Sequence, residues 1–230
     1  MKNLEDKYKY FLQVFMWKKI CGNDEVWNLI RKCQRISNDD SSRPETPEPE
    51  DLVQFIKEIN LALKPLNIAI KSMRDELSTE MFYILINENN NNISRLASDY
   101  KMQELEVFKG LAISIVKSED GKISSTDALN LEIDIKISKR EVNDMLQMFV
   151  VDGWLCEKDG YYFFSTRAIA ELQHFFRENY MDNISICYQC KNIVFQGPVC
   201  QNCDIKLHNY CMKRTGIKLC PSCRKDFYVS

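Results

Sequence analysis

The chain has 230 residues, a formal net charge of −2, and 45% hydrophobic residues. At roughly 100–200 residues per domain, this length allows one to three domains. The sequence contains no run of about 18 apolar residues, which excludes a membrane-spanning helix. The first residues are charged and lack the apolar core of a secretory signal, so we expect an intracellular protein, in which disulfides are rare. The near-neutral charge gives no global field that would draw the whole molecule onto nucleic acid.

The first part of the chain predicts helices followed by a β ribbon. Apolar residues at helical spacing mark three helices, at 4–15, 26–33 and 52–63. An acidic, proline-rich stretch at 39–51 is predicted to form a loop. The pattern then changes to β-prone runs at 67–71 and 81–86. This order of elements predicts a winged-helix domain over residues 1–100.

The same order recurs over residues 101–182. The predicted helices lie at 105–115, 124–129, 142–150 and 169–176. Ser138 is a plausible N-cap for the third of these, and Ser165 or Thr166 for the last. The dipeptide Asp159-Gly160 lies between two apolar runs, which is a strong hairpin signal. These features predict a second winged-helix domain.

The third helix of the second winged-helix domain is not a typical DNA reader. It begins with Lys139 and Arg140, whose charges are offset by Glu141 and Asp144. Base-reading helices usually come with phosphate-binding cations around them. We therefore expect direct DNA binding to be weak or absent, and protein–protein docking to be the main use of the winged helices. The candidates for such docking on the hairpin are Trp154, Tyr161 and Phe163.

Ten cysteines fall into two groups. Cys21, Cys33 and Cys156 lie in apolar patterns and are predicted to be buried thiols. The other seven join one histidine in four pairs, each with two residues between its members: Cys187/Cys190, Cys200/Cys203, His208/Cys211 and Cys220/Cys223. Zn²⁺ takes four tetrahedral sulfur or nitrogen ligands, so eight ligands make two closed structural sites. A disulfide framework would need a secretory context and would leave one of the seven cysteines unpaired.

The zinc-binding block, predicted as a domain over residues 183–230, is too small to fold by burial alone. Metal binding is therefore expected to supply its folding free energy. From Cys187 to Ser230 there are seven basic and two acidic residues, a formal charge of +5. Two Zn²⁺ add 4 and seven thiolates subtract 7, which leaves +2. This is mildly basic, and too little for a nucleic-acid trap.

Tandem winged helices followed by this zinc block resemble one family, the non-SMC element one subunit of the five–six structural-maintenance-of-chromosomes (SMC) complex. The resemblance rests on residues 74–77 leading into Phe82-Tyr83, on residues 93–100, and on the zinc block with its histidine in fifth place. It implies a mainly α fold with small β hairpins and a C-terminal cross-braced RING-like domain. It also implies a nuclear RING-type ubiquitin ligase subunit that acts in DNA repair with a MAGE-like subunit and a kleisin.

The resemblance implies specific roles for residues of the zinc block. The ligands would interleave, with Cys187, Cys190, His208 and Cys211 on the first zinc and Cys200, Cys203, Cys220 and Cys223 on the second. Sequential pairing, as in two zinc ribbons, stays open from the sequence. A ubiquitin-conjugating enzyme would be contacted by Tyr188, Gln189, Ile217, Leu219 and Pro221. Arg224 lies where active RING domains often place a cation that orients ubiquitin.

The sequence departs from strong RING ligases and leaves two alternatives. Position 189 is Gln where many RING domains have an aliphatic residue, and no Trp lies between Cys211 and Cys220. We therefore expect weak ligase activity without the MAGE-like partner. One alternative is a histone-tail reader of the PHD type, although such fingers usually carry an aromatic residue where this chain has Lys218. The other alternative is an architectural subunit without ligase activity.

Overall fold

The computed structural model describes residues 5–37, 49–88, 100–200, 202–225 and 227. Most of the predicted loop at 39–51 and of the family-like stretch at 93–100 lies outside these residues. Contacts divide the chain into two compact units: Met1–Arg74 with Glu80–Asn89, and Asp75–Thr79 with Asn90–Ser230. The predicted domain limits at 100/101 and 182/183 stay a prediction. Among the described residues, no helix is long and apolar enough to cross a membrane.

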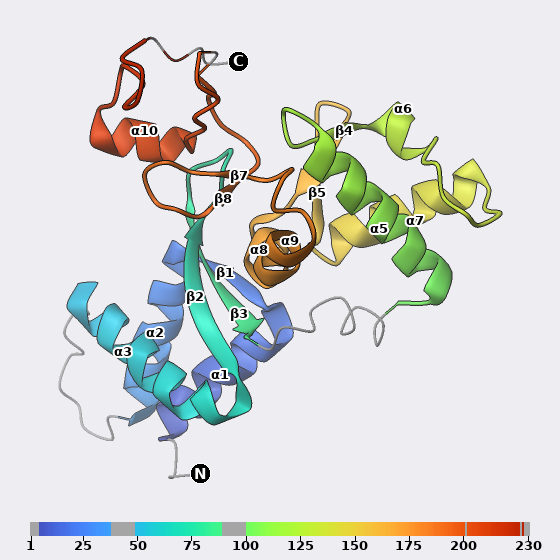
Figure 1. The fold of residues 1–230 in the computed structure, drawn as a ribbon. Helices are drawn as coiled ribbons and strands as arrows, with labels where there is room; N and C mark the ends of the chain where they lie inside the picture. Colours follow the sequence, from blue (N-terminus) through green and yellow to red (C-terminus); the bar gives the residue numbers. More distant parts are fainter. Residues whose placement is uncertain (1–4, 38–48, 89–99, 201, 226, 228–230) are drawn as a thin grey trace. The chain divides into compact units, whose positions relative to one another are not determined.

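The first unit has the helices and ribbon of a winged helix (Figure 1). Its elements are α1 (Asp6–Lys18), β1 (Ile20–Gly22), α2 (Asn23–Ser37), α3 (Pro49–Leu63), η1 (Lys64–Leu66), β2 (Ile68–Arg74) and β3 (Met81–Asn87). The strands form an antiparallel sheet in the order β1-β3-β2. Phe11, Phe15, Ile30 and Ile59 are fully buried in its core, and each such side chain contributes about 2 kcal/mol by burial. Strand β1 has only three residues, too few for a periodic signal in the sequence.

The second unit contains the second winged helix (Figure 1). Its elements are α5 (Met102–Lys117), β4 (Ile123–Ser124), α6 (Ser125–Ala128), α7 (Lys139–Val151), β5 (Leu155–Lys158), β6 (Tyr161–Phe164), α8 (Thr166–Glu171) and α9 (Gln173–Asn179). Ser138 caps α7 by accepting a hydrogen bond from the Glu141 amide. Asp159 and Gly160 have φ values of 53° and 77°, which is the type I′ geometry expected of a tight hairpin.

The last predicted helix of this winged helix is interrupted. Leu172 has φ −96° and ψ 7°, and it separates α8 from α9. Its side chain is 1% exposed. The apolar spacing predicted one helix, because a single non-helical residue leaves the pattern of buried positions unchanged.

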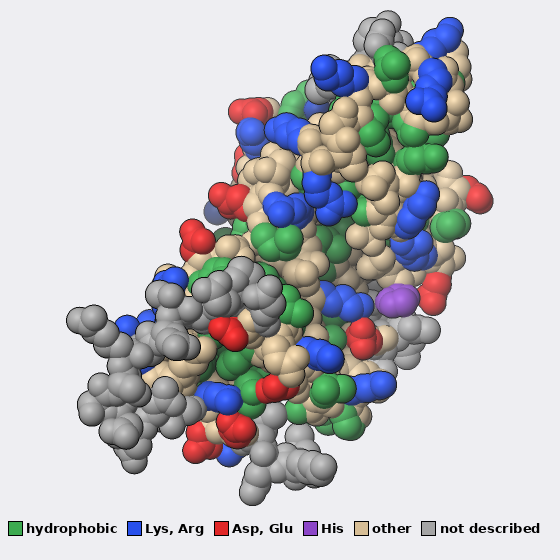
Figure 2. Space-filling model, turned by 90° about the vertical axis from the view of Figure 1, so that its left-hand side faces the viewer, with side chains coloured by type: hydrophobic (Ala, Val, Ile, Leu, Met, Phe, Trp, Pro, Cys, Tyr) green, Lys and Arg blue, Asp and Glu red, His purple; other side chains and the backbone are tan. Residues whose placement is uncertain are grey.

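The zinc-binding block follows in the same unit. It contains the hairpin β7 (Ser185–Ile186) and β8 (Ile193–Val194) and the short helix α10 (Asn209–Thr215). Its small core joins Val194, Leu207 and Phe227 to the buried cysteines. The exposed cations of this block are Lys191, Lys213, Arg214, Lys218, Arg224 and Lys225. Basic side chains recur among apolar ones at the top of the face in Figure 2.

Candidate metal centres

Eight side chains of the zinc-binding block gather in two clusters. The first cluster contains Cys187, Cys190, His208 and Cys211, and the second contains Cys200, Cys203, Cys220 and Cys223. Within each cluster the potential ligand atoms all lie within 4.8 Å of one another. The clusters take alternate pairs along the chain, so the arrangement is crosswise, and the sequential grouping that the sequence left open is not the one seen.

Three of the four pairs share one turn, which we call a knuckle. In each knuckle the residue after the second cysteine has a positive φ: 61° at Lys191, 55° at Asp204 and 62° at Arg224. The amide of that residue donates to the carbonyl of the first cysteine, at 3.0, 2.9 and 2.9 Å respectively. A left-handed residue at this point turns the chain back sharply, which brings both sulfurs to the same side of the turn.

The dimensions of the second cluster fit a tetrahedral zinc site. The Sγ–Sγ distances are 3.4 Å for Cys200–Cys223, 3.3 Å for Cys203–Cys220 and 3.6 Å for Cys203–Cys223. A tetrahedron with Zn–S bonds of about 2.3 Å has edges of about 3.8 Å. Four cysteine sulfurs at these separations would fill all four coordination positions of a zinc ion. The second cluster therefore matches a closed structural zinc site.

The electrostatics of the clusters favour a bound cation. Burial raises the pKa of the Cys187 thiol, but hydrogen bonds from His208 and from backbone amides of the knuckle outweigh it and bring the pKa to about 6. Burial also raises the pKa of the Cys220 thiol, but hydrogen bonds from the amides of Cys223 and Ser222 outweigh it and bring the pKa to about 6. In contrast, burial and the neighbouring Cys187 and Cys190 raise the pKa of Cys211 to about 12. Sulfurs this close cannot all ionise unless a cation offsets their charge.

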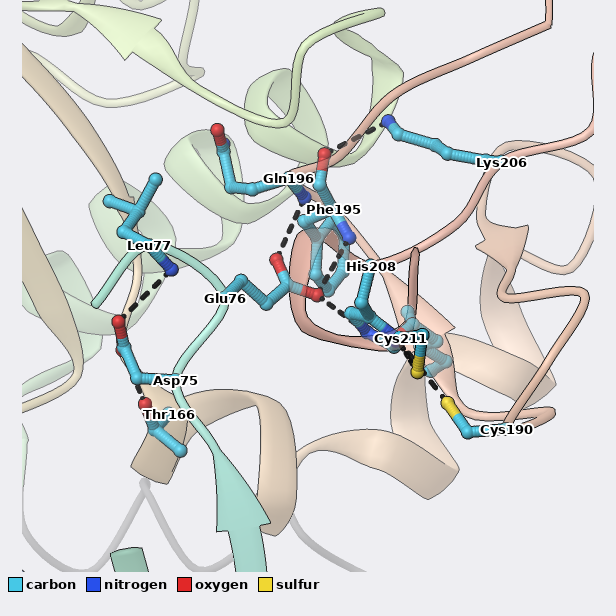
Figure 3. A network of polar contacts seen from close by, with 11 residues as sticks. Asp75, Glu76, Leu77, Thr166, Cys190, Phe195, Gln196, Lys206, His208 and Cys211 are labelled. Atoms are coloured by element: carbon cyan, nitrogen blue, oxygen red, sulfur yellow. Dashed lines mark hydrogen bonds and ion pairs between the residues drawn. The ribbon is translucent and has the colours of Figure 1, made fainter. Parts of the chain in front are cut away.

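The two ring nitrogens of His208 face different groups: one faces the cysteines of the first cluster, and the other faces two oxygen acceptors. Its Nδ1 lies 3.3 Å from Sγ of Cys190 and 3.9 Å from Sγ of Cys211, so Nδ1 is the atom that faces the first cluster. Its Nε2 lies 3.1 Å from Oε1 of Glu76 and 3.0 Å from the carbonyl oxygen of Ile193. Figure 3 shows Glu76 reaching His208 from the segment that joins β2 to β3. The tautomer that binds metal through Nδ1 carries its proton on Nε2, where these two acceptors lie.

The zinc-binding block is fastened to the second winged helix within one unit. The ring of Phe195 packs against Phe164 and Phe176, with ring centroids 5.1 and 5.3 Å apart. The buried ammonium of Lys206 donates to the carbonyl oxygens of Glu119 and Phe195, at 3.1 and 2.9 Å. Burial lowers the pKa of Lys206. These contacts fix the orientation of the two clusters relative to the second winged helix.

The predicted contact residues for a conjugating enzyme differ in exposure. Tyr188 and Leu219 are 42% and 47% exposed, which is unusual for large hydrophobic side chains. Gln189 and Arg224 are exposed as well, whereas Ile217 and Pro221 are half-buried. The side chain of Ile217 packs against the core of the block.

The docking candidates and the isolated thiols, all predicted outside the zinc-binding block, differ in solvent exposure. Trp154 and Phe163 are 5% and 9% exposed and belong to the core, whereas Tyr161 is 40% exposed. Of the three isolated thiols, Cys21 and Cys33 are buried and Cys156 is half-buried.

Sequence reasoning missed two residues that support the first cluster. Glu76 lies in one of the stretches that carried the family resemblance, but its role depends on contacts with residues about 120 positions later. Lys206 lies two residues before His208, and no local pattern marks it as buried. Both depend on tertiary contacts that spacing does not reveal.

Comparisons with known proteins cover nearly the whole chain. The family profile described as "Nse1 non-SMC component of SMC5-6 complex" matches residues 8–135, and a profile described as "RING-like domain" matches residues 187–223. The "Non-structural maintenance of chromosomes element 1 homolog" of Rattus norvegicus is 33% identical over 227 residues, which is 96% of this chain and 83% of the relative. The corresponding protein of Schizosaccharomyces pombe is 29% identical, over 96% of this chain and 91% of the relative.

A solved structure supports the same similarity. A chain of the solved "Nse1-Nse3-Nse4 complex" superposes with a TM-score of 0.86 at 32% sequence identity. The match covers 98% of both chains. The similarity therefore includes the winged helices and the zinc-binding block together.

Proposed function

The chain belongs to the Nse1 family, the non-SMC component of the SMC5-6 complex, and from this membership we propose that it is a RING-type ubiquitin ligase subunit of such a complex. The observation that carries the proposal is the crosswise pair of cysteine and histidine clusters beside exposed apolar residues on the knuckles. A binding module of this kind needs no nucleophile of its own. It accelerates the transfer of ubiquitin by orienting a conjugating enzyme that carries ubiquitin as a thioester.

We assign the first zinc to Cys187, Cys190, His208 and Cys211 and the second to Cys200, Cys203, Cys220 and Cys223. Bound zinc would supply structural cross-links between the knuckles and α10. With four protein ligands at each ion, no position is open for a catalytic water. The contribution of this chain to ubiquitin transfer is therefore to shape a surface.

That surface comprises Tyr188 and Gln189 on the first knuckle and Leu219 and Pro221 around the third, with Ile217 supporting it from the core. An exposed aromatic and an exposed leucine beside two of the zinc-binding turns fit a protein partner, because exposed apolar groups are the ones that gain from being covered. Gln189 makes this surface less apolar. We therefore propose that ligase activity is weak for the chain alone and rises in the assembled complex.

Arg224 is also part of a backbone turn, and a test of its contact with ubiquitin must leave that turn intact. It holds the left-handed position of the third knuckle, with φ 62°. Arg and Ala both carry a Cβ and share a cost of about 1 kcal/mol in this conformation, which Gly avoids. Arg224→Gly thus removes the side chain and keeps the knuckle. Asp204→Gly is the matched control, because Asp204 has the same backbone position in the second knuckle and no proposed contact with the enzyme.

The experiment is a ubiquitin discharge assay on the chain alone and on its complex with an Nse3-type and an Nse4-type subunit. We expect faster discharge from the complex, a loss of about tenfold with Arg224→Gly, and no change with Asp204→Gly. Zinc content of both variants should stay at two equivalents. No discharge above background by the complex would overturn the ligase proposal and favour an architectural subunit.

The superposed chain comes from a complex that also contains Nse3 and Nse4. We propose that the present chain assembles with a MAGE-like Nse3-type subunit and a kleisin of the Nse4 type, through its winged helices. The same family membership supports a role in DNA repair in the nucleus. Co-purification of the three subunits tests the assembly directly, and a chain that remains monomeric with both partners present would contradict it.

A further inference from the structure

Glu76 has an environment that its sequence position does not explain. Its side chain is 6% exposed. The carboxylate accepts hydrogen bonds from the amide of Phe195 at 3.1 Å and from the amide of Gln196 at 2.7 Å. The same oxygen that faces Phe195 lies 3.1 Å from Nε2 of His208. An ionised carboxylate only accepts hydrogen bonds, and each of these three partners is an N–H donor.

The geometry points to Glu76 as a positioning residue for the first zinc, acting through His208. We infer that its carboxylate orients the imidazole and strengthens Nδ1 as a ligand, in the manner of an outer-shell acceptor. The inference rests on zinc at the first cluster and is independent of ligase activity. A histidine that binds metal usually donates its other N–H to a carboxylate or a carbonyl, and loss of such a partner typically weakens metal binding 10–100-fold.

The carbonyl of Ile193 is a second acceptor for the same N–H, at 3.0 Å. That carbonyl alone can hold the tautomer, so the specific contribution of Glu76 is its negative charge. A charge-assisted hydrogen bond is about twice as strong as a neutral one. The carboxylate also ties the metal to the segment Phe195–Gln196, because the same two oxygens bind both amides. Glu76→Gln keeps the size of the side chain and removes its charge, but the new amide nitrogen cannot accept a hydrogen bond, so one of the facing N–H groups also loses its acceptor. Comparison of the two zinc sites within one variant therefore separates the role of Glu76 from a general loosening of the fold.

The chain contains its own control in the second cluster. Its four ligands are all sulfur, and none of them contacts Glu76 among the described contacts. If Glu76 acts through His208, its loss weakens zinc binding at the first cluster and leaves zinc binding at the second cluster unchanged. A general loosening of the fold weakens both. Co²⁺ distinguishes the two sites by spectrum, since a ligand set of three sulfurs and one nitrogen absorbs differently from four sulfurs.

The test uses the full chain with Glu76→Gln and Glu76→Ala, and Asp75→Asn as the matched control. Asp75 lies in the same turn but binds Thr166 and the amides of Leu77 and Ser78. Zinc release is followed with a chromogenic chelator, and the variants are loaded with Co²⁺ for spectra. We expect Glu76→Gln to speed release of one equivalent about tenfold and to shift only the three-sulfur spectrum. Glu76→Ala should have a larger effect.

Two results would overturn the inference. Unchanged release and unchanged spectra in Glu76→Gln would show that Ile193 suffices. Equal acceleration at both sites, or the same effect in Asp75→Asn, would assign Glu76 a packing role. A wild-type chain that binds no zinc at the first cluster would instead contradict the assignment of the metal site itself. Measurement of zinc in the wild-type chain reveals this outcome before any variant is made.

Discussion

Lys206 donates a hydrogen bond from its buried ammonium group to the carbonyl oxygen of Phe195, at 2.9 Å. The same Nζ reaches the carbonyl oxygen of Glu119 at 3.1 Å. One cation thus links the strand end that carries Phe195 to the loop after α5, in a site that is 7% exposed. Hydrogen bonds from a charged donor contribute about 1.5–3 kcal/mol each. Loss of the Lys206 ammonium would leave the buried carbonyl oxygen of Phe195 without this donor.

Replacing Lys206 with Met tests this link. Met keeps most of the apolar length of the side chain and removes the donor. We expect the free energy of unfolding of the zinc-loaded chain to fall by about 1–3 kcal/mol, measured by urea denaturation. Lys213→Met on α10 is the control, because Lys213 is exposed. A Lys206 variant as stable as the Lys213 variant would show that the buried ammonium contributes nothing net.

Gly197 allows a close backbone approach inside the zinc-binding block. A Cβ at this position would lie 2.0 Å from the carbonyl oxygen of Leu207, the residue before His208. We expect Gly197→Ala to displace the chain at His208 and to lower zinc content below two equivalents, measured by elemental analysis. Gly216→Ala is the control: it has a φ of 65° but open space around it. Its cost is about 1 kcal/mol, and its zinc content should stay at two.

Local patterns predicted much of this molecule. The spacing of Phe11 and Phe15, or of Val142 and Leu146, depends only on which face of a helix is buried, so the helices could be placed from sequence. The Cys-x-x-Cys pairs are also local, because a single turn brings both sulfurs together. For the same reason Asp159-Gly160 identified its hairpin.

Contacts between distant segments were out of reach of such patterns. The bond from Glu76 to His208 and the packing of Phe195 on Phe164 join residues that no periodicity connects. The break at Leu172 was missed because a helix that bends keeps its buried face. The crosswise grouping of ligands came from a family resemblance and not from spacing, since both groupings satisfy the same four pairs.

Removal of the metal should unfold the zinc-binding block alone. The core of the block is small and includes the cysteines themselves, so its folding free energy depends on zinc. After chelation we expect fast hydrogen exchange at the knuckle amides of Lys191, Asp204 and Arg224, while amides of α5 and α7 stay protected. Elemental analysis before chelation should give two zinc per chain. Knuckle amides that remain protected without metal would contradict the assignment of both sites.

Thiol reactivity gives a prediction with a defined pH dependence. Burial, with a smaller contribution from Glu25, raises the pKa of Cys21 to about 12, and burial raises the pKa of Cys33 to about 11. An ordinary thiol here has a pKa of 9.0. The thiolate is the reactive form, so at pH 8.5 iodoacetamide should leave both residues unmodified in the folded chain. Chelation should expose the seven cysteines of the zinc-binding block to alkylation and still spare Cys21 and Cys33.

The raised values also fix the sign of the effect of Cys21 and Cys33 on stability. The folded chain keeps these two protons when the unfolded chain loses them, so their contribution is complete below pH 9 and is lost as the pH rises toward 11–12. Alanine at both positions removes this dependence. We therefore expect the unfolding midpoint of the first unit in urea to fall more steeply between pH 9 and 10.5 in the parent chain than in the Cys21→Ala, Cys33→Ala variant. Parallel slopes would show that the two thiols titrate alike in the folded and unfolded chain.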